Sequence, residues 1–390
     1  MRILQVHNFY QKPGGEDQVF AAEYELLTSR GHFVMQYSAH NDEIGRISGV
    51  RAGVRTIWNR QSYRDVRRLL KEHACDLLHA HNTFPLISPA IYYAAEAERV
   101  PVIQTLHNYR LLCPAANLFR EGRVCEQCLG SRLAYHAVAH RCYRHSAPAS
   151  ATVSLMLAGH RIAGTWRSKV KTYIALTDFA KGKFIEGGLP EDRLTVKGNF
   201  LPVDPGAGSG SGGYALFIGR LAAGKGIGTL LGAWARLGEQ LPLKIAGDGP
   251  MRESVRKQAT QLNIDYLGRC PHAGVIELLK SAELLIFPSL WYEGLPMTII
   301  EALACATPVI ASSTGPINEL IVDGVNGFRF LPGDADALVD CVRNVLAHPE
   351  RRAPLRLSAR ADFEQRYTPE RNYQSLMRIY DHALAGMDHL

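Results

Sequence analysis

Two cationic side chains stand in a glycine-containing loop in the second half of the chain. Arg220 follows the apolar run 214–218, and Lys225 lies between two glycines before the helix-like stretch 227–237. This order of strand, glycine loop and helix presents free backbone N–H groups to an anion, and the two cations would lie beside a diphosphate. The alternative is a basic loop without a ligand, because a single glycine-rich loop is a weak signal.

Two carboxylates follow in the same half of the chain. Glu293 lies in a loop after the apolar run 284–287, and Glu301 lies eight positions later in the early turns of a predicted helix. Such a spacing is common by chance. Between two strands, however, both carboxylates can face one crevice and accept hydrogen bonds from sugar and ribose hydroxyls. The backbone N–H groups of Gly294 and Leu295 would face a diphosphate.

The elements that must position these residues are short apolar runs separated by helix-like sequence. These runs occupy 3–6, 77–79, 102–106 and 173–176 in the first half, and 214–218, 243–246, 284–287 and 308–311 in the second. Alternation of this kind is typical of a parallel sheet with helices on both faces, an α/β fold. A Gly-Asp-Gly turn after the run 243–246 makes Asp248 a further candidate contact of the crevice.

A chain of 390 residues is too long for one compact α/β core, and a glycine-rich stretch divides it. We predict a Rossmann-like domain over 1–202, a linker over 203–213 and a second Rossmann-like domain over 214–368. The last segment, 369–390, contains a helical stretch that could return to the first domain.

The order of these motifs resembles that of the retaining GT-B glycosyltransferases of family 4. Arg220, Lys225, the Gly-Asp-Gly turn and the pair Glu293-x7-Glu301 carry this resemblance, which covers about 214–345 well and the first half more loosely. It implies two Rossmann-like domains that face each other across a cleft. In that arrangement the C-terminal domain binds a nucleotide-sugar donor and the N-terminal domain binds the acceptor.

The resemblance also implies a role for individual residues. Arg220 and Lys225 would hold the diphosphate, Glu301 would bind the ribose hydroxyls, and Glu293 and His107 would contact the transferred sugar. Without the motif context, His107 would be interpreted as a core or loop histidine. The implied catalytic residues are Arg220, Lys225, Glu293 and His107, and the implied donor-binding residues are Gly14, Gly15, Asp248, Gly294, Leu295 and Glu301.

The predicted activity is therefore that of a hexosyltransferase-type glycosyltransferase of EC 2.4, with retention of anomeric configuration. It would move a sugar to a saccharide acceptor, such as a lipid-linked intermediate of bacterial polysaccharide or glycoconjugate synthesis. Fixed cations at the leaving diphosphate can lower the barrier without a metal, so no cofactor is expected for catalysis. A sugar-nucleotide epimerase of GT-B architecture is the alternative enzyme. A nucleic-acid-binding protein would leave Glu293 and Glu301 without a role, so we expect no nucleic-acid partner.

Four cysteines fall within thirty residues of one another, in a predicted insertion of the first domain over about 113–145. Cys125-x-x-Cys128 is a chelating pair, and Cys113 and Cys142 flank it. Four thiolates could form a closed tetrahedral site for a structural zinc ion, and a reduced, metal-free cluster is the alternative. Without a secretory signal, thiols or a metal site are favoured over disulfides.

Basic residues concentrate in the first half of the chain. Residues 1–200 hold 26 Lys and Arg against 17 Asp and Glu, whereas residues 201–390 hold 18 against 20. The segment 51–71 combines seven of these cations with apolar residues, including Trp58, and could lie on an anionic membrane. No apolar run is long enough to cross a bilayer. We expect a cytoplasmic protein with peripheral contact to the inner face of the membrane, and the alternative is a solvated basic surface.

Overall fold

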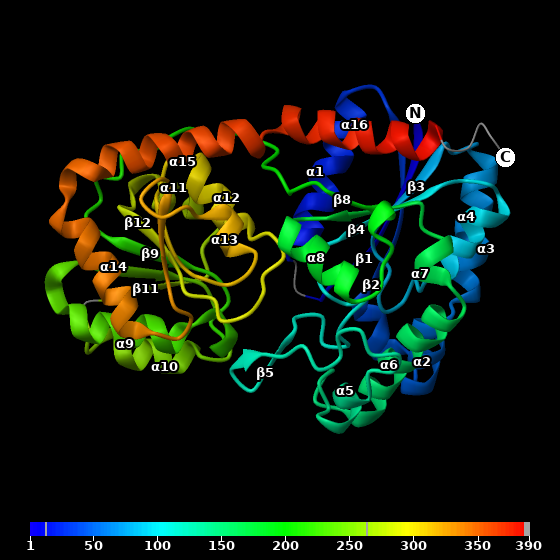
Figure 1. The fold of residues 1–390 in the computed structure, drawn as a ribbon, viewed down its shortest axis with the longest axis horizontal. Helices are drawn as coiled ribbons and strands as arrows, with labels where there is room; N and C mark the ends of the chain where they lie inside the picture. Colours follow the sequence, from blue (N-terminus) through cyan, green and yellow to red (C-terminus); the bar gives the residue numbers. More distant parts are fainter. Residues whose placement is uncertain (12–13, 263, 386–390) are drawn as a thin grey trace. The chain divides into compact units, whose positions relative to one another are not determined.

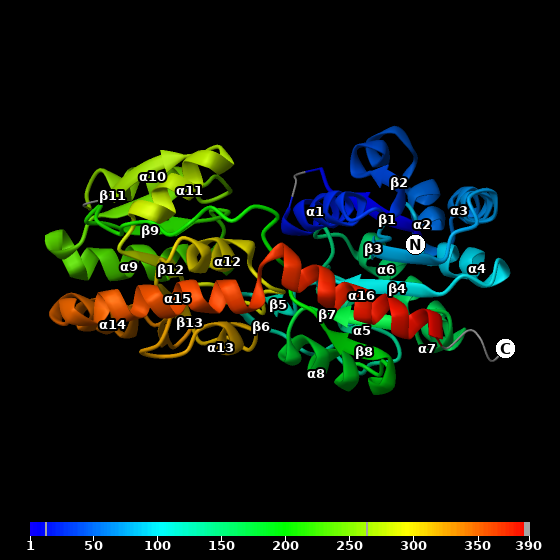
Figure 2. The ribbon, with the colours of Figure 1, turned by 90° about the horizontal axis from the view of Figure 1, so that it is seen from above.

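The computed structural model describes residues 1–11, 14–262 and 264–385, which form two compact units. Unit 1 comprises Met1–Leu118, Cys125–Asn199 and Pro369–Leu390, as far as these are described, and unit 2 comprises Phe119–Val124 and Phe200–Thr368. Each unit is a parallel sheet covered by helices (Figures 1 and 2).

Unit 1 is built on a six-stranded sheet in the order β2-β1-β3-β4-β7-β8. Its paired strands run parallel. The central strands β3 and β4 are buried along their whole length because helices cover the sheet, although they carry polar residues such as His79 and His81. The strands are β1 (Arg2–Phe9), β2 (Phe33–His40), β3 (Leu77–Asn82), β4 (Val102–Leu106), β7 (Thr172–Ala175) and β8 (Leu194–Val196). The helices are α1 (Gly15–Ser29), α2 (Gly49–Ile57), α3 (Arg60–Glu72), α4 (Ala90–Ala97), α5 (Tyr135–Ala139), α6 (Ala147–Ile162), α7 (Thr165–Ser168), α8 (Asp178–Glu186) and α16 (Pro369–Ala385).

Unit 2 repeats this architecture with the sheet order β11-β10-β9-β12-β13-β14. The strands are β9 (Ala215–Ile218), β10 (Leu243–Ala246), β11 (Ile264–Gly268), β12 (Leu284–Phe287), β13 (Val309–Ser312) and β14 (Gly327–Phe330). The helices are α9 (Ile227–Leu237), α10 (Arg252–Ala259), α11 (His272–Ser281), α12 (Met297–Ala304), α13 (Ile317–Leu320), α14 (Ala335–Ala347) and α15 (Arg352–Arg366). Trp234 of α9 is 1% exposed and belongs to the core of this unit.

The two sheets confirm the predicted fold class of two Rossmann-like α/β units. In each sheet the first strand of the unit is an interior strand, and the chain order runs outward from it in both directions. The order reverses between β1 and β3 in unit 1 and between β9 and β12 in unit 2. Ligands of such sheets bind beyond the carboxyl ends of the strands at this reversal.

The C-terminal helix α16 packs on unit 1 although the chain reaches it from unit 2 (Figure 1). Leu376 and Tyr380 of α16 are buried in one core cluster with Ile3 and Leu77 of the unit 1 sheet. The predicted segment 369–390 therefore contains a helix of unit 1 up to Ala385, and residues 386–390 lie outside the described part of the chain.

The glycine-rich stretch predicted as a linker is held against unit 2. The backbone N–H groups of Gly208, Gly210 and Gly212 donate to carbonyl oxygens of Cys305, Lys280 and Ser281, respectively. A Cβ atom at Gly208 would lie 2.2 Å from the Cα of Lys280. Glycine is needed at this position for close backbone approach.

One hairpin and the lengths of the helices bear on the predictions. The short hairpin β5 (Phe119–Arg120) and β6 (Arg123–Val124), within the predicted insertion, is grouped with unit 2. There the ring of Phe119 meets that of Trp291 edge-on, with centroids 5.7 Å apart. Among the helices that the structure describes, none is long and apolar enough to cross a membrane.

Candidate functional site

The reversal point of unit 2 brings two loops together. The loop after β9 ends at Gly226, which precedes α9 with φ of 72°, and the loop after β12 begins at Pro288. A Cβ atom at Gly226 would lie 1.8 Å from the Pro288 carbonyl oxygen, so glycine allows this contact. The Leu290 N–H also donates to the Gly224 carbonyl oxygen at 2.8 Å. The loops that carry Lys225 and Glu293 are thus fixed to each other.

Lys225 and Glu293 form an ion pair across these loops. Their Nζ and Oε1 atoms lie 2.6 Å apart, with side chains 21% and 13% exposed. The Ser289 hydroxyl also donates to Glu293 Oε1, at 2.6 Å. The Lys225 ammonium lies 5.3 Å from the ring centroid of Trp291. The positive charge is therefore partly desolvated and surrounded by groups that stabilise it.

The other predicted residues of this loop pair differ in exposure. Arg220 is exposed, and Leu295 is buried beside the half-buried Gly294 ahead of α12. Asp248 is exposed, and its Oδ1 accepts from the Gly249 N–H at 2.8 Å, within its own turn. The Asp248 carboxylate thus serves the local turn in this structure.

Glu301 lies on α12 and is nearly buried. Its Oε1 lies 3.0 Å from Nε2 of His272, the first residue of α11. The two side chains are 7% and 65% exposed, so His272 lies at the surface above the carboxylate. Sequence analysis missed His272, whose one signal is its place directly after Pro271 at the start of a helix.

In unit 1, His107 follows β4 and contacts a second histidine. His107 Nε2 lies 3.0 Å from Nδ1 of His81, which belongs to β3, and the two rings stack with centroids 5.3 Å apart. Burial, the largest cause, lowers the pKa of His107 well below its ordinary value. His107 is therefore neutral at physiological pH. Both rings line a pocket of unit 1 together with Asn108 and Arg110.

Gly14 and Gly15 lie at the N-terminus of α1, which acidic side chains surround. The Gly14 N–H donates to Asp17 Oδ2 at 2.7 Å. Burial raises the pKa of Glu16 to about 7, and Asn108 donates a hydrogen bond to this carboxyl group at 3.1 Å. Part of the expected anion-binding capacity of this helix end is thus already used by Asp17.

Comparison with known families identifies both halves of the chain. Residues 14–204 match the family described as Glycosyltransferase Family 4, and residues 209–362 match Glycosyl transferases group 1. The chain is related to the GT-B glycosyltransferases. Its two Rossmann-like units are those of the GT-B fold.

Individual relatives and solved structures agree with this GT-B assignment. An uncharacterized glycosyltransferase of Methanocaldococcus jannaschii is 32% identical over 44% of this chain and 45% of its own. A phosphatidyl-myo-inositol mannosyltransferase of Mycobacterium leprae is 29% identical over 60% of this chain and 65% of its own. The first sequence relatives thus match over about half of their own length or less.

Two solved structures cover nearly the whole GT-B chain. Anabaena HepE in complex with UDP-glucose superposes with a TM-score of 0.66 at 20% identity, over 100% of both chains. A sucrose-phosphate synthase from Thermosynechococcus elongatus gives a TM-score of 0.72 at 15% identity, over 99% of both. At this identity the likeness concerns the fold.

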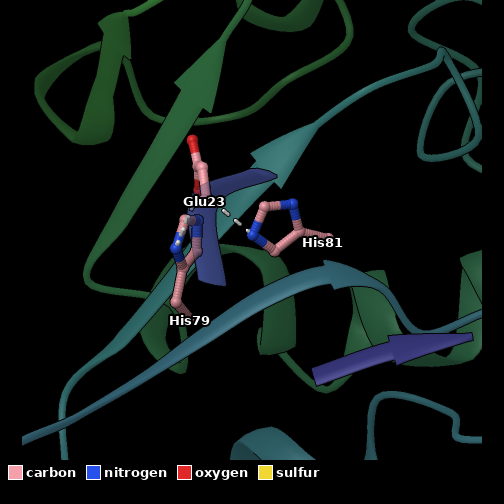
Figure 3. Close-up of side chains that lie close together, drawn as sticks. All are labelled: Glu23, His79 and His81. Carbon is pink, nitrogen blue, oxygen red and sulfur yellow. Dashed lines mark ion pairs between the residues drawn. The ribbon is translucent and has the colours of Figure 1, made fainter. Parts of the chain in front are cut away.

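A buried polar cluster in unit 1 of this GT-B chain was not predicted. Glu23 of α1 points toward His79 and His81 of β3 (Figure 3). Glu23 Oε2 lies 3.3 Å from His81 Nε2, and Glu23 Oε1 lies 2.7 Å from Lys197 Nζ. Burial alone would raise the pKa of Glu23, but the Lys197 ammonium and the contact with His81 hold it well below its ordinary value. The carboxylate is thus charged in the core.

This cluster also has the composition of a metal site. Among the described residues, Glu23, His79 and His81 are the one group of three metal-ligating side chains whose ligand atoms lie within 4.8 Å of one another. The Lys197 ammonium, however, already binds the carboxylate, and a second cation there would be repelled. His79 also has two other partners, because its ring nitrogens lie 2.8 Å from the Tyr380 and Thr105 hydroxyls. The cluster is better described as a buried ion pair with hydrogen-bonded neighbours.

The four predicted zinc ligands lie near one another, and none of them is in a disulfide. Cys113 and Cys128 are buried, and Cys125 and Cys142 are partly buried. Burial and the neighbouring thiols, Cys113 foremost, raise the pKa of Cys128 to about 11. The ligand atoms of Glu23, His79 and His81 all lie within 4.8 Å of one another, but no three of these cysteine sulfur atoms do. A zinc site would therefore require the cysteine side chains to move closer together. The zinc site remains a prediction.

Proposed function

We propose that the chain is a retaining glycosyltransferase of EC 2.4, which moves a sugar from a nucleotide-sugar donor to a saccharide acceptor. The observation that carries this proposal is the Lys225–Glu293 pair on two loops at the reversal point of the unit 2 sheet. The family matches of both halves support it. The titles of HepE structures name UDP and UDP-glucose as ligands, which supports a nucleotide-sugar as donor.

In the proposed mechanism, Lys225 exchanges its partner when the donor binds. Diphosphate oxygens would compete with Glu293 for the ammonium, and Arg220 would add a second cation. The acceptor oxygen then bonds to the anomeric carbon as the bond from that carbon to the diphosphate breaks. The acceptor proton leaves with the diphosphate. Fixed cations stabilise the charge that builds up on the leaving group, so we propose catalysis without a metal.

Release from Lys225 would let the Glu293 carboxylate accept hydrogen bonds from the transferred sugar. Glu301 is held by His272 at the neighbouring helix ends, where it would accept hydrogen bonds from the ribose hydroxyls. In this proposal Glu293 binds the transferred sugar of the donor and Glu301 binds its ribose.

We propose that the acceptor is lipid-linked and that unit 1 meets it at the inner face of an anionic membrane. Val50, Val54 and Ile57 are 81%, 60% and 37% exposed along one side of α2. The neighbouring α6 adds Ile162, which is 88% exposed. Helices α2 and α3 also carry exposed arginines, namely Arg51, Arg60, Arg64, Arg67 and Arg68. Such a surface suits partial insertion between anionic headgroups, and a mycobacterial relative is named as a mannosyltransferase of a phospholipid.

Thermal unfolding with a panel of nucleoside diphosphates and nucleotide-sugars tests the donor assignment. A ligand at 100 times its dissociation constant should raise the free energy of unfolding by about 2.7 kcal/mol. Lys225→Ala should weaken this effect, and Lys257→Ala, at an exposed lysine of α10, should not. The ligand that stabilises the protein is then incubated with candidate acceptors. Release of an isomerised sugar without any acceptor would overturn the transferase in favour of an epimerase.

A further inference from the structure

Three side chains of unit 1 form a line from the core to the pocket. Glu23 lies on α1, His81 on β3, and His107 directly after β4. The Glu23 Oε2 and His81 Nε2 atoms lie 3.3 Å apart, and the His81 Nδ1 and His107 Nε2 atoms lie 3.0 Å apart. Glu23 and His81 are 0% and 3% exposed, whereas His107 is half-buried at the pocket.

The chemistry of these contacts fixes where the hydrogens lie. The Glu23 carboxylate can only accept. Its Oε2 lies 3.3 Å from His81 Nε2, and neither of these two buried atoms makes a hydrogen bond to another described residue. His81 Nε2 therefore carries a hydrogen directed at Glu23. In the arrangement proposed below, His81 Nδ1 keeps its lone pair and accepts from His107 Nε2–H. His107, which is neutral, is left with a lone pair on its own Nδ1.

We propose that Glu23 and His81 are positioning residues for His107, which hold its ring and its Nε2–H tautomer so that Nδ1 accepts a hydrogen bond from a sugar hydroxyl. This inference rests on the proposed transferase function and adds two residues to it. No described residue donates to His107 Nδ1. In the other tautomer, Nδ1 would be a donor, and the hydroxyl would lose its acceptor.

The surrounding network explains why the line stays in place. Lys197 Nζ binds Glu23 Oε1 at 2.7 Å and Asn372 Oδ1 at 2.6 Å, which keeps the carboxylate charged and oriented. His79 lies beside His81, with ring centroids 4.4 Å apart, and blocks rotation of that ring. The C-terminal helix α16 contributes Asn372, so it helps to anchor the far end of the line.

Two isosteric substitutions of His81 separate positioning from packing. In His81→Asn the amide oxygen can take the place of Nδ1 and accept from His107, but contact with Glu23 is lost. In His81→Gln the amide can reach Glu23, but no acceptor remains at the Nδ1 position. We expect His81→Gln to lower kcat about 10- to 100-fold with little change in the donor KM, the range seen when an orienting partner is removed. His81→Asn should keep most of the kcat.

A second readout does not need activity. The ¹⁵N chemical shifts of His107, in protein labelled at histidine, should indicate the Nε2–H tautomer in wild type and His81→Asn, and a mixture in His81→Gln. Wild-type kcat and an unchanged tautomer in His81→Gln would overturn the proposal. Equal losses of kcat and of thermal stability in both variants would also overturn it, because that is the result of packing alone. If wild type transfers no sugar while the tautomer responds as expected, the proposed function fails and the positioning stands.

Discussion

Two lysine–glutamate pairs of nearly the same length, one from each unit, lie in different environments. The Lys197–Glu23 pair of unit 1 is 2.7 Å long with side chains 3% and 0% exposed, whereas the Lys225–Glu293 pair of unit 2 is 2.6 Å long with side chains 21% and 13% exposed. The first joins a helix to the segment after β8 in the core. The second joins the two loops that follow the carboxyl ends of the interior strands β9 and β12. Burial and supporting elements, not distance, distinguish a structural pair from one that can exchange its partner for a ligand.

Removal of Lys197 should give the largest effect on stability. Lys197→Ala leaves the Glu23 carboxylate buried without its counterion, which typically costs about 3–5 kcal/mol of unfolding free energy. Urea unfolding measures this loss. The double variant Lys197→Met with Glu23→Gln removes both charges and should recover much of it. If Lys197→Ala is no less stable than Lys225→Ala, the contrast between the two pairs is wrong.

Lys225→Ala should instead affect turnover. Loss of one charge contact at the leaving group costs about 2–4 kcal/mol of transition-state stabilisation, or roughly a 30- to 900-fold lower kcat. Steady-state kinetics with the donor found by the ligand panel measures this, and circular dichroism checks that the fold is retained. Lys257→Ala is the matched control. Turnover at the wild-type level in Lys225→Ala would reject the diphosphate assignment.

The buried pair should also show itself in the pH dependence of stability. The folded-state pKa of Glu23 lies well below its ordinary value of 4.5. Its contribution is therefore fully present above the unfolded pKa and is lost as pH falls through 4.5 toward the folded pKa. Urea unfolding at several pH values below 5 should show a steeper loss in wild type than in the Lys197→Met, Glu23→Gln double variant. Parallel curves would contradict the assignment of a charged Glu23.

The cysteine cluster adds a third site to the comparison of the two ion pairs, with two buried and two partly buried thiols. We propose that Cys113, Cys125, Cys128 and Cys142 bind a structural zinc, and elemental analysis should then find about one zinc per chain. A local loss of about 1 kcal/mol after chelation would lower the Tm of a unit of this size by roughly 2–4 °C. Cys128→Ser should remove both the metal and the response to chelator, whereas Cys341→Ser in unit 2 should retain them. Purified protein that is fully active and contains no zinc would contradict the proposed zinc site.

The smallest single effect is expected at the membrane surface of unit 1. Each exposed cation near an anionic bilayer contributes about 1 kcal/mol, so Arg64→Ala should weaken binding to phosphatidylserine-containing vesicles by roughly fivefold at low salt. Arg256→Ala, on the exposed face of α10 in unit 2, should leave it unchanged. Binding should also weaken as salt rises. Protein that ignores these vesicles while it glycosylates a soluble acceptor would show that the basic surface is only solvated.

The packing of two segments differs from what their composition suggests. The glycines of 203–213 indicated a free linker, but close approach to the backbone of unit 2 requires glycine at Gly208 and Gly212. Trp58 stood in a basic segment, yet its ring packs against those of Tyr63 and Tyr93 rather than lying with the exposed stripe of α2. Composition describes which residues are present, and only the surrounding elements determine what each one contacts.

The sequence by itself determined the two parallel sheets and the loops that carry Arg220, Lys225 and Glu293. Buried parallel strands are apolar runs, and a ligand loop must follow such a run, so both features are local and visible in the printed chain. Only the tertiary structure decided the line from Glu23 through His81 to His107. Its members, with Lys197, come from separate elements of unit 1, and Lys197 is 174 residues from Glu23. A buried charge is stable only where partners from distant parts of the chain contact it, and no local sequence pattern predicts those contacts.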